Sequence, residues 1–146
     1  MEEIVYKKCL PGHIKYINPQ EVDRTNKLLY QTEEFKQAVR ENFSISAWVG
    51  NQCIGAAGLI QVHPHRAIAW AMLSADAGPY MLSVTRKIKN FFKSQPTKRI
   101  EITVLEGFKE GHKWAKLLNF TLETPEGMRG HGVGGETEYL YSRVKE

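Results

Sequence analysis

Apolar and polar residues alternate in several short runs of the chain, and this period of two is typical of β-strands. The first run covers residues 4–9 and is closed by a Pro-Gly pair. Two further runs fill residues 44–62 around Gly50-Asn51, a pair suited to a tight hairpin because both residues tolerate positive φ. Another run follows at residues 67–74. The pattern predicts one strand and then, after an interval, a three-stranded meander.

A helical period replaces the alternation in the interval between these runs. Asn18 and Pro19 offer an N-cap and a first turn for one helix. Thr32 offers the N-cap of a second, because the acids that follow it suit the positive end of the helix dipole. The buried stripe expected for this second helix is Phe35, Ala38, Val39 and Phe43.

The second half of the chain predicts two more helices and three more strands. Pro79 opens a helix whose apolar stripe is Met81, Val84, Ile88, Phe91 and Phe92. Residues 99–105 form a strand, and the helix after it is expected to end with Asn119 in the left-handed conformation. Strand, helix and strand in this order predict a parallel pair joined by a right-handed crossover. The last two strands flank a glycine-rich stretch.

The expected order is therefore β-α-α-β-β-β-α-β-α-β-β, an α/β fold with a mixed sheet in a single domain over residues 1–146. A content of 42% hydrophobic and 25% charged residues is that of a globular protein. No apolar run approaches the roughly 20 residues of a membrane helix, and acids stand where a signal peptide would be basic, which favours a cytoplasmic protein.

Metal and disulfide chemistry are disfavoured by the spacing of the relevant residues. Cys9 and Cys53 follow no metal or disulfide-framework spacing, so reduced, half-buried thiols are expected. His63 and His65 flank a proline in a turn and lack a third candidate ligand nearby. No metal site is predicted.

Three successive stretches carry a resemblance to a known family: "AIAWAMLS", "ADAGPYMLSVTRKI" and "ITVLEGFKEGHKWAKLLNF". In this order they resemble the central strand, pyrophosphate turn and following elements of the GCN5-related N-acetyltransferase (GNAT) superfamily. Asn119-Phe120 stands where that family has a terminal Gly-Phe. The resemblance covers nearly the whole chain. It implies a splayed mixed sheet and acetyl-CoA or another acyl-CoA as cosubstrate.

The resemblance assigns candidate contacts to acyl-CoA. A backbone amide at the end of the central strand would hold the thioester carbonyl, and the following helix N-terminus would face the pyrophosphate. Two basic residues further along that helix would meet remaining phosphate charge. The candidates are Met72, Leu73, Ser74, Gly78, Tyr80, Arg86 and Lys87.

The chain also departs from the family pattern. The usual glycine-rich pyrophosphate motif is reduced to Gly78, and Asp76 would repel a phosphate unless it caps the helix. Ala115 replaces the tyrosine that in many relatives protonates the leaving thiolate, and Phe108 replaces an asparagine of the same helix. More narrowly, "GHIKYINPQEVDRT" and the glycine-bearing final hairpin resemble small phage-encoded GNAT-like proteins, which also lack that tyrosine.

Acyl transfer to an amine needs a base for the amine and a proton for the thiolate. Glu101 is the nearest acid in register with the central strand, with a solvent-facing strand position as the alternative interpretation. Tyr139 is a second catalytic candidate. Tyr141, Arg129 and His131 are candidates for the acceptor side, with packing as the alternative for the tyrosines.

The glycine-rich stretch "PEGMRGHGVGGETEY" (125–139) is not expected to be a phosphate loop, because a strand rather than a helix follows it. A linker is disfavoured because that strand should complete the sheet. The remaining hypotheses are a hairpin tip on the acceptor side, which carries Arg129 and His131, and a plain flexible loop.

Charge is unevenly distributed, although the net charge is only +4. No acid stands between Asp76 and Glu101, while Arg86, Lys87, Lys89, Lys93, Lys98 and Arg99 are basic. An anion could dock there, or the segment could be a solvated helix face. The small excess charge and the lack of a binding motif argue against a nucleic-acid partner without excluding one.

Two hypotheses follow for the function. The first is an acyl-CoA-dependent N-acyltransferase, phage-encoded, acting on an amine of a protein, a modified base or a small molecule. The second is a catalytically silent GNAT-like protein that binds a host protein or is a virion component, as the missing phosphate motif and tyrosine suggest. Location in the host cytoplasm or the virion follows from either, and the sequence names neither the acceptor nor the oligomeric state.

Overall fold

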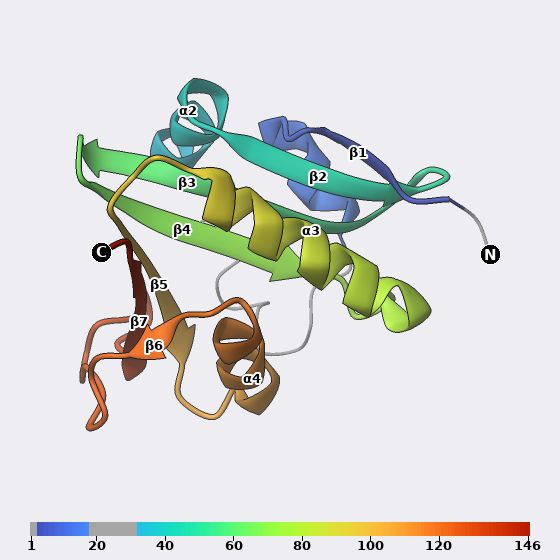
Figure 1. Ribbon diagram of the computed structural model, residues 1–146. Helices are drawn as coiled ribbons and strands as arrows, with labels where there is room; N and C mark the ends of the chain where they lie inside the picture. Colours follow the sequence, from blue (N-terminus) through green and yellow to red (C-terminus); the bar gives the residue numbers. More distant parts are fainter. Residues whose placement is uncertain (1–2, 18–31) are drawn as a thin grey trace. The chain divides into compact units, whose positions relative to one another are not determined.

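The computed structural model describes residues 3–17 and 32–146 and orders their strands β1-β2-β3-β4-β5-β7-β6 in one mixed sheet (Figure 1). The mixed α/β fold predicted from the sequence is confirmed, whereas the helix expected from Pro19 lies outside the described residues. The strands are β1 Val5–Lys8, β2 Ser44–Val49, β3 Gln52–His63, β4 Arg66–Leu73, β5 Arg99–Leu105, β6 Thr121–Leu122 and β7 Glu138–Val144. The helices are α2 Glu33–Glu41, α3 Met81–Ser94 and α4 Lys109–Leu117, with 3-10 turns η1 Pro11–Tyr16 and η3 Gly78–Tyr80.

The chain divides into two compact units. The first unit is Met1–Ile60 with Ala69–Val84, and the second is Gln61–Ile68 with Thr85–Glu146. Within the described residues no helix is both long and apolar enough to cross a bilayer.

In the first unit, β1, β2 and β3 pair in antiparallel fashion. The predicted hairpin between β2 and β3 is confirmed, and Gly50 takes a φ of 58° in its turn. Two residues suffice for this connection because a positive φ matches the twist of the flanking strands.

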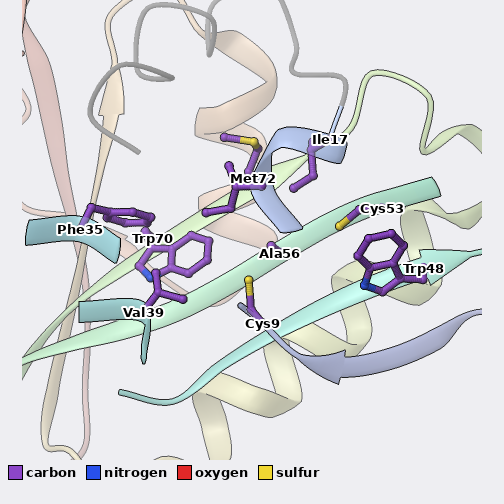
Figure 2. Packing of buried hydrophobic residues seen from close by; sticks show 10 residues of the cluster. Cys9, Ile17, Phe35, Val39, Trp48, Cys53, Ala56, Trp70 and Met72 are labelled. Atoms are coloured by element: carbon purple, nitrogen blue, oxygen red, sulfur yellow. The ribbon is translucent and has the colours of Figure 1, made fainter. Parts of the chain in front are cut away.

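Large apolar side chains from η1, α2 and the strands make the core of the first unit. Figure 2 shows the indole of Trp70 beside Phe35 and Val39, and the Phe35 and Trp70 rings meet edge to face at 5.1 Å. Cys9 and Cys53 are free thiols with no exposed surface, so they are more deeply buried than the sequence indicated. Burial raises the pKa of Cys9 to about 12 and that of Cys53 to about 11, which keeps both protonated.

Helix α2 begins and ends at residues whose polar groups satisfy its free backbone atoms. The Thr32 hydroxyl accepts from the Phe35 amide at 3.2 Å, as its N-cap pattern predicts. At the other end, the Lys8 ammonium donates to the Val39 and Asn42 carbonyls at 3.0 and 2.6 Å. The prediction that Phe43 extends the buried stripe is wrong, because the helix has already ended and the side chain is 70% exposed.

In the second unit, the start of β4 pairs in parallel with β5, from Arg66 opposite Arg99 to Ile68 opposite Glu101. The predicted parallel pair is therefore confirmed. β5 pairs with β7 and β7 with β6, both in antiparallel fashion. Asn119 ends α4 with a φ of 70°, as predicted.

Helices α3 and α4 are in contact in this unit. The Trp114 indole of α4 donates to the Thr85 hydroxyl of α3 at 2.9 Å. Val84, Ile88 and Phe92 form the buried stripe of α3, as the periodicity predicts. Met81, which was also assigned to this stripe, is 38% exposed because it stands in the first turn of the helix.

The packing of β3 against Trp70 generates a stability prediction. A Cβ at Gly58 would meet indole atoms of Trp70 at 2.7–2.8 Å, so we expect Gly58→Ala to destabilise the protein by about 1–3 kcal/mol. Urea denaturation measures this change. Gly12→Ala is the matched control, since no atom lies within 4 Å of its Cβ position, and it should change stability by less than about 1 kcal/mol. Equal effects of the two substitutions would contradict the close contact.

Candidate functional site

The C-terminal end of β4 offers a backbone amide at an unpaired strand edge. The Ser74 amide donates to the Ile54 carbonyl of β3 at 2.9 Å. Since backbone groups of successive strand residues point to opposite edges, the amide of Leu73 points away from β3. The register of β4 with β5 ends at Ile68, five residues earlier. Of the three predicted backbone contacts Met72, Leu73 and Ser74, only Leu73 thus turns its amide toward this edge.

The turn after β4 uses most of its amides internally. Asp76 N–H donates to the Ser74 hydroxyl at 3.0 Å, and Ala77 N–H donates to the Ser74 carbonyl at 3.1 Å. The amide of Tyr80 donates to the Ala77 carbonyl at 2.8 Å. Met81 N–H donates to the Gly78 carbonyl, and Pro79 has no N–H. Among the residues that the structure describes, the amides of Ala75 and Gly78 are the two in this turn for which no acceptor is found, and Gly78 is the one of them at the start of η3.

Gly78 combines this amide with open space. Its φ is +42°, a conformation that favours glycine, and no atom lies within 4 Å of a Cβ built on it. Asp76 does not cap η3, since the N-cap residue is Ala77 and makes no side-chain cap bond. The Asp76 carboxylate instead accepts from Gln52 Nε2 at 3.1 Å and stays exposed. Its negative charge therefore belongs to the same turn as Gly78, two residues before it.

The two basic candidates lie further along the helix. Arg86 and Lys87 are exposed and belong to the part of α3 in the second unit. They follow Gly78 by eight and nine residues, roughly 12 Å along a helix axis.

Glu101 is buried between two arginines rather than facing solvent. Its carboxylate accepts from Arg66 Nη2 at 2.8 Å and from Arg99 Nε at 2.6 Å. The interpretation as a solvent-facing strand residue is wrong, because only 8% of Glu101 is exposed. The hydrogen bond from Arg66 lowers the pKa of Glu101, against the opposing effect of burial. A carboxylate held in this way has a low proton affinity, which disfavours it as a general base.

The ion pairs continue across the sheet of the second unit. Arg99 also donates to the Glu123 carboxylate at 2.9 Å, and Ser142 of β7 donates to the same carboxylate. The hydrogen bond from Arg99 lowers the pKa of Glu123. Three neighbouring strand segments are thus tied together by charged hydrogen bonds.

Tyr139 and Tyr141 meet a histidine of α4 that sequence reasoning missed. His112 Nε2 lies 3.2 Å from the Leu105 carbonyl, which can only accept, so this nitrogen carries the proton. Nδ1 therefore accepts from the Tyr141 hydroxyl at 2.7 Å. Burial raises the pKa of Tyr141, which is 2% exposed. The Tyr141 hydroxyl is thus committed to His112 and shielded from solvent.

Tyr139 is more accessible than Tyr141. Its ring meets that of His112 edge to face at 5.3 Å, and its hydroxyl lies 3.4 Å from a Glu106 carboxylate oxygen. Glu106 was also missed from the sequence. The available signal was the alternation of the two tyrosines, which puts both on the face of β7 that meets α4.

The glycine-rich hairpin between β6 and β7 folds around a carboxylate of its own. The Glu136 carboxylate accepts from the Gly134 amide at 2.9 Å, and side chains at Gly132 or Gly134 would clash with it. Main-chain bonds further close the hairpin, among them Gly132 N–H to the Glu136 carbonyl at 2.9 Å. The glycines therefore permit a close internal contact.

The two acceptor-side candidates of this hairpin differ in their surroundings. His131 Nδ1 lies 2.8 Å from the Glu138 carboxylate, which fixes its ring at the base of the hairpin. Arg129 is exposed. Among the described residues no three His, Cys, Asp or Glu side chains are grouped so that they could hold a metal ion.

No protein-family model and no curated protein matches the sequence. Solved structures of acetyltransferases do match the fold. The ribosomal-protein-S5-alanine acetyltransferase of Vibrio fischeri matches with a TM-score of 0.64 and 15% identity, over 100% of this chain and 95% of that one. An N-acetyltransferase of Staphylococcus aureus matches with a TM-score of 0.70 and 10% identity, over 98% of this chain and 99% of that one.

A third match is the microcin C7 self-immunity acetyltransferase in complex with acetyl-CoA and AMP, with a TM-score of 0.65 and 14% identity over 99% of this chain and 94% of that one. A further match is an acetyltransferase of the GNAT family from Streptococcus pneumoniae, with a TM-score of 0.65 and 13% identity, over 99% of this chain and 100% of that one. The chain thus has the GNAT fold, as the family resemblance of its sequence implies.

The Glu101 network generates a prediction about stability and pH. Glu101→Gln leaves two arginines without their shared carboxylate, and we expect it to lower the free energy of unfolding by about 2 kcal/mol at pH 7. This value is smaller than for a fully buried pair because both arginines are partly exposed to solvent. Because the folded pKa of Glu101 is lowered, its contribution is present above the unfolded pKa, about 4.3, and is lost as the pH falls through the folded value. The difference in unfolding free energy between variant and wild type, measured by urea denaturation, should therefore shrink as the pH is lowered below the unfolded pKa.

The control for this prediction is Glu33→Gln. The Glu33 side chain is 80% exposed and, among the described residues, pairs with Lys36 alone at 3.5 Å, so the substitution should lower the free energy of unfolding by less than about 0.5 kcal/mol. A Glu101→Gln variant as stable as wild type at neutral pH would show that the network contributes nothing.

Proposed function

We propose that this protein is an acyltransferase that moves an acetyl group, or another acyl group, from acyl-CoA to an amine. The observation that carries the proposal is the Leu73 amide, which points to the edge of β4 beyond its pairing with β5. A fold shared with acetyltransferases, one of them in complex with acetyl-CoA, supports it.

The proposed reaction needs one oxyanion donor and two proton transfers. The acceptor amine, once neutral, attacks the thioester carbonyl, a C–N bond forms, and the C–S bond then breaks. The Leu73 N–H would donate to the carbonyl oxygen as it gains negative charge, which is the largest catalytic contribution a fixed backbone group can make. The amine proton finally goes to a base and the thiolate takes up a proton.

Of the two candidates for proton transfer, Tyr139 is the more accessible. Its hydroxyl lies 3.4 Å from Glu106 and remains partly exposed, so a proton can be exchanged. Glu101, the other candidate, is held as a carboxylate by Arg66 and Arg99. We therefore retain Tyr139, with Glu106 as its partner, and propose a positioning role for Glu101.

For the cosubstrate phosphates we propose the Gly78 amide, with Tyr80 beside it and Arg86 and Lys87 as long-range charges. The open space over Gly78 leaves room for a phosphate oxygen to approach the backbone. On the acceptor side we propose the region of Arg129 and His131, whereas the hydroxyl of the third candidate, Tyr141, is buried and bonded to His112. The acceptor class itself, whether protein, modified base or small molecule, follows from none of these contacts.

A second function is favoured by the same turn. Because four amides of the turn are used internally and Pro79 has none, the phosphate cradle is poorer than the family pattern requires. The alternative is therefore a catalytically silent GNAT-like protein of phage origin that binds a host protein or belongs to the virion.

Calorimetric titration with acetyl-CoA tests the proposed site through Gly78→Asp. A carboxylate next to the Gly78 amide should repel the pyrophosphate and weaken binding by about tenfold or more. Gly78→Asn is the matched control, because asparagine has the same shape and tolerates a positive φ without adding charge. We expect the control to remain within about threefold of wild type.

The outcomes separate the two functions. Binding that is lost only in the aspartate variant, together with thiol release in the presence of amines, supports the acyltransferase. Binding without thiol release across a broad set of amines supports the silent protein. An absence of binding at millimolar acetyl-CoA overturns the proposed cosubstrate site.

A further inference from the structure

Charge in the second unit is distributed so that the outer face of α3 stays strongly basic. The unit contains thirteen lysines and arginines against eight acids, an excess of five. The first unit has the remaining seven basic and eight acidic residues, so the whole positive excess of the protein belongs to the second. The net charge of +4 hides this asymmetry.

Most acids of the second unit are already engaged elsewhere. Their partners are arginines, a histidine, a tyrosine hydroxyl and a backbone amide in the sheet and the glycine-rich hairpin. The acids so engaged are Glu101, Glu106, Glu123, Glu136 and Glu138. None of them neutralises α3.

The basic residues of α3 lie in a row. Arg86, Lys89 and Lys93 follow the spacing i, i+3 and i+7, which puts them on one side of the helix, opposite the buried stripe. None of the three makes an ion pair within the part of the chain that the structure describes. The neighbouring helix α4 adds three more lysines against one acid, Glu110.

We propose that this row, Arg86, Lys89 and Lys93, is a binding surface for the phosphate backbone of double-stranded nucleic acid. The row is roughly 10 Å long, comparable with two or three consecutive phosphates of one strand. Cations that read no bases give binding that is independent of sequence. The proposal does not depend on acyl-CoA binding.

The chemistry of the face disfavours other polyanions. A single strand needs exposed aromatic side chains for base stacking, whereas Phe91 is half-buried against Phe92 at 5.5 Å. A membrane-surface helix needs an apolar face that is free to contact lipid. In α3 the residues of the apolar stripe, Val84, Ile88 and Phe92, are buried within the protein. An acidic protein would need aromatic anchors around the charges.

Fluorescence anisotropy with a labelled mixed-sequence duplex of about 24 base pairs tests the proposal. For three phosphate contacts we expect the logarithm of the binding constant to fall with a slope of about −2.7 against the logarithm of salt concentration, or roughly 40-fold between 50 and 200 mM KCl. The double variant Lys89→Gln/Lys93→Gln should reduce that slope by about 1.8 and weaken binding at 50 mM by about tenfold.

The control is Lys36→Gln/Arg40→Gln on α2, which removes the same charge at the same i, i+4 spacing from the other unit. It should bind like wild type. The proposal is overturned if the duplex does not bind at about 50 mM salt, if the control loses as much affinity, or if a single strand or polyglutamate binds more tightly. Acetyl-CoA titration of the same variants keeps a failure here distinct from a failure of the acyltransferase.

Discussion

The parallel pairing of β4 with β5 covers only three residues, and a buried carboxylate lies at its last position. Glu101 stands opposite Ile68 and accepts from Arg66 on β4 and from Arg99 on its own strand. The pairing is therefore fixed by charged hydrogen bonds at one end of the two strands. The register of β4 with β5 ends at Ile68, and the proposed oxyanion donor, the Leu73 amide, lies five residues further along β4.

The same network limits the chemistry that Glu101 can perform. A carboxylate with two arginine partners is stabilised in its charged form, so it holds a structural position well and accepts a proton poorly. In the proposed reaction, proton transfer would require groups that are less tightly held. Tyr139 and Glu106 meet that condition, whereas Tyr141 is buried and donates to His112. The second unit therefore contains a cluster of charged hydrogen bonds around Glu101 and a more accessible contact between Tyr139 and Glu106, the pair proposed for proton transfer.

In two loops, the turn after β4 and the glycine-rich hairpin, backbone amides donate to acceptors within the loop itself. In the turn after β4, backbone carbonyls and the Ser74 hydroxyl accept most of the amides that would otherwise face a phosphate. In the glycine-rich hairpin, the Glu136 carboxylate takes the place of an external anion. The acids of the hairpin and the sheet form their hydrogen bonds there, and α3 itself contains no acid. The uneven charge of the surface is thus a consequence of where the carboxylates are used.

The sequence by itself determined the strands, the three described helices, the hairpin at Gly50 and the end of α4 at Asn119, because these depend on local periodicity and on the conformations that glycine and asparagine permit. It also determined the parallel pair and, through its resemblance, the GNAT fold. It did not determine which polar groups are paired. Phe43 is exposed because α2 ends first, Glu101 is buried because Arg66 and Arg99 converge on it, and Leu73 is singled out by a bond between Ser74 and Ile54. Only the tertiary structure decided these points, because each depends on residues distant in sequence that local patterns do not relate.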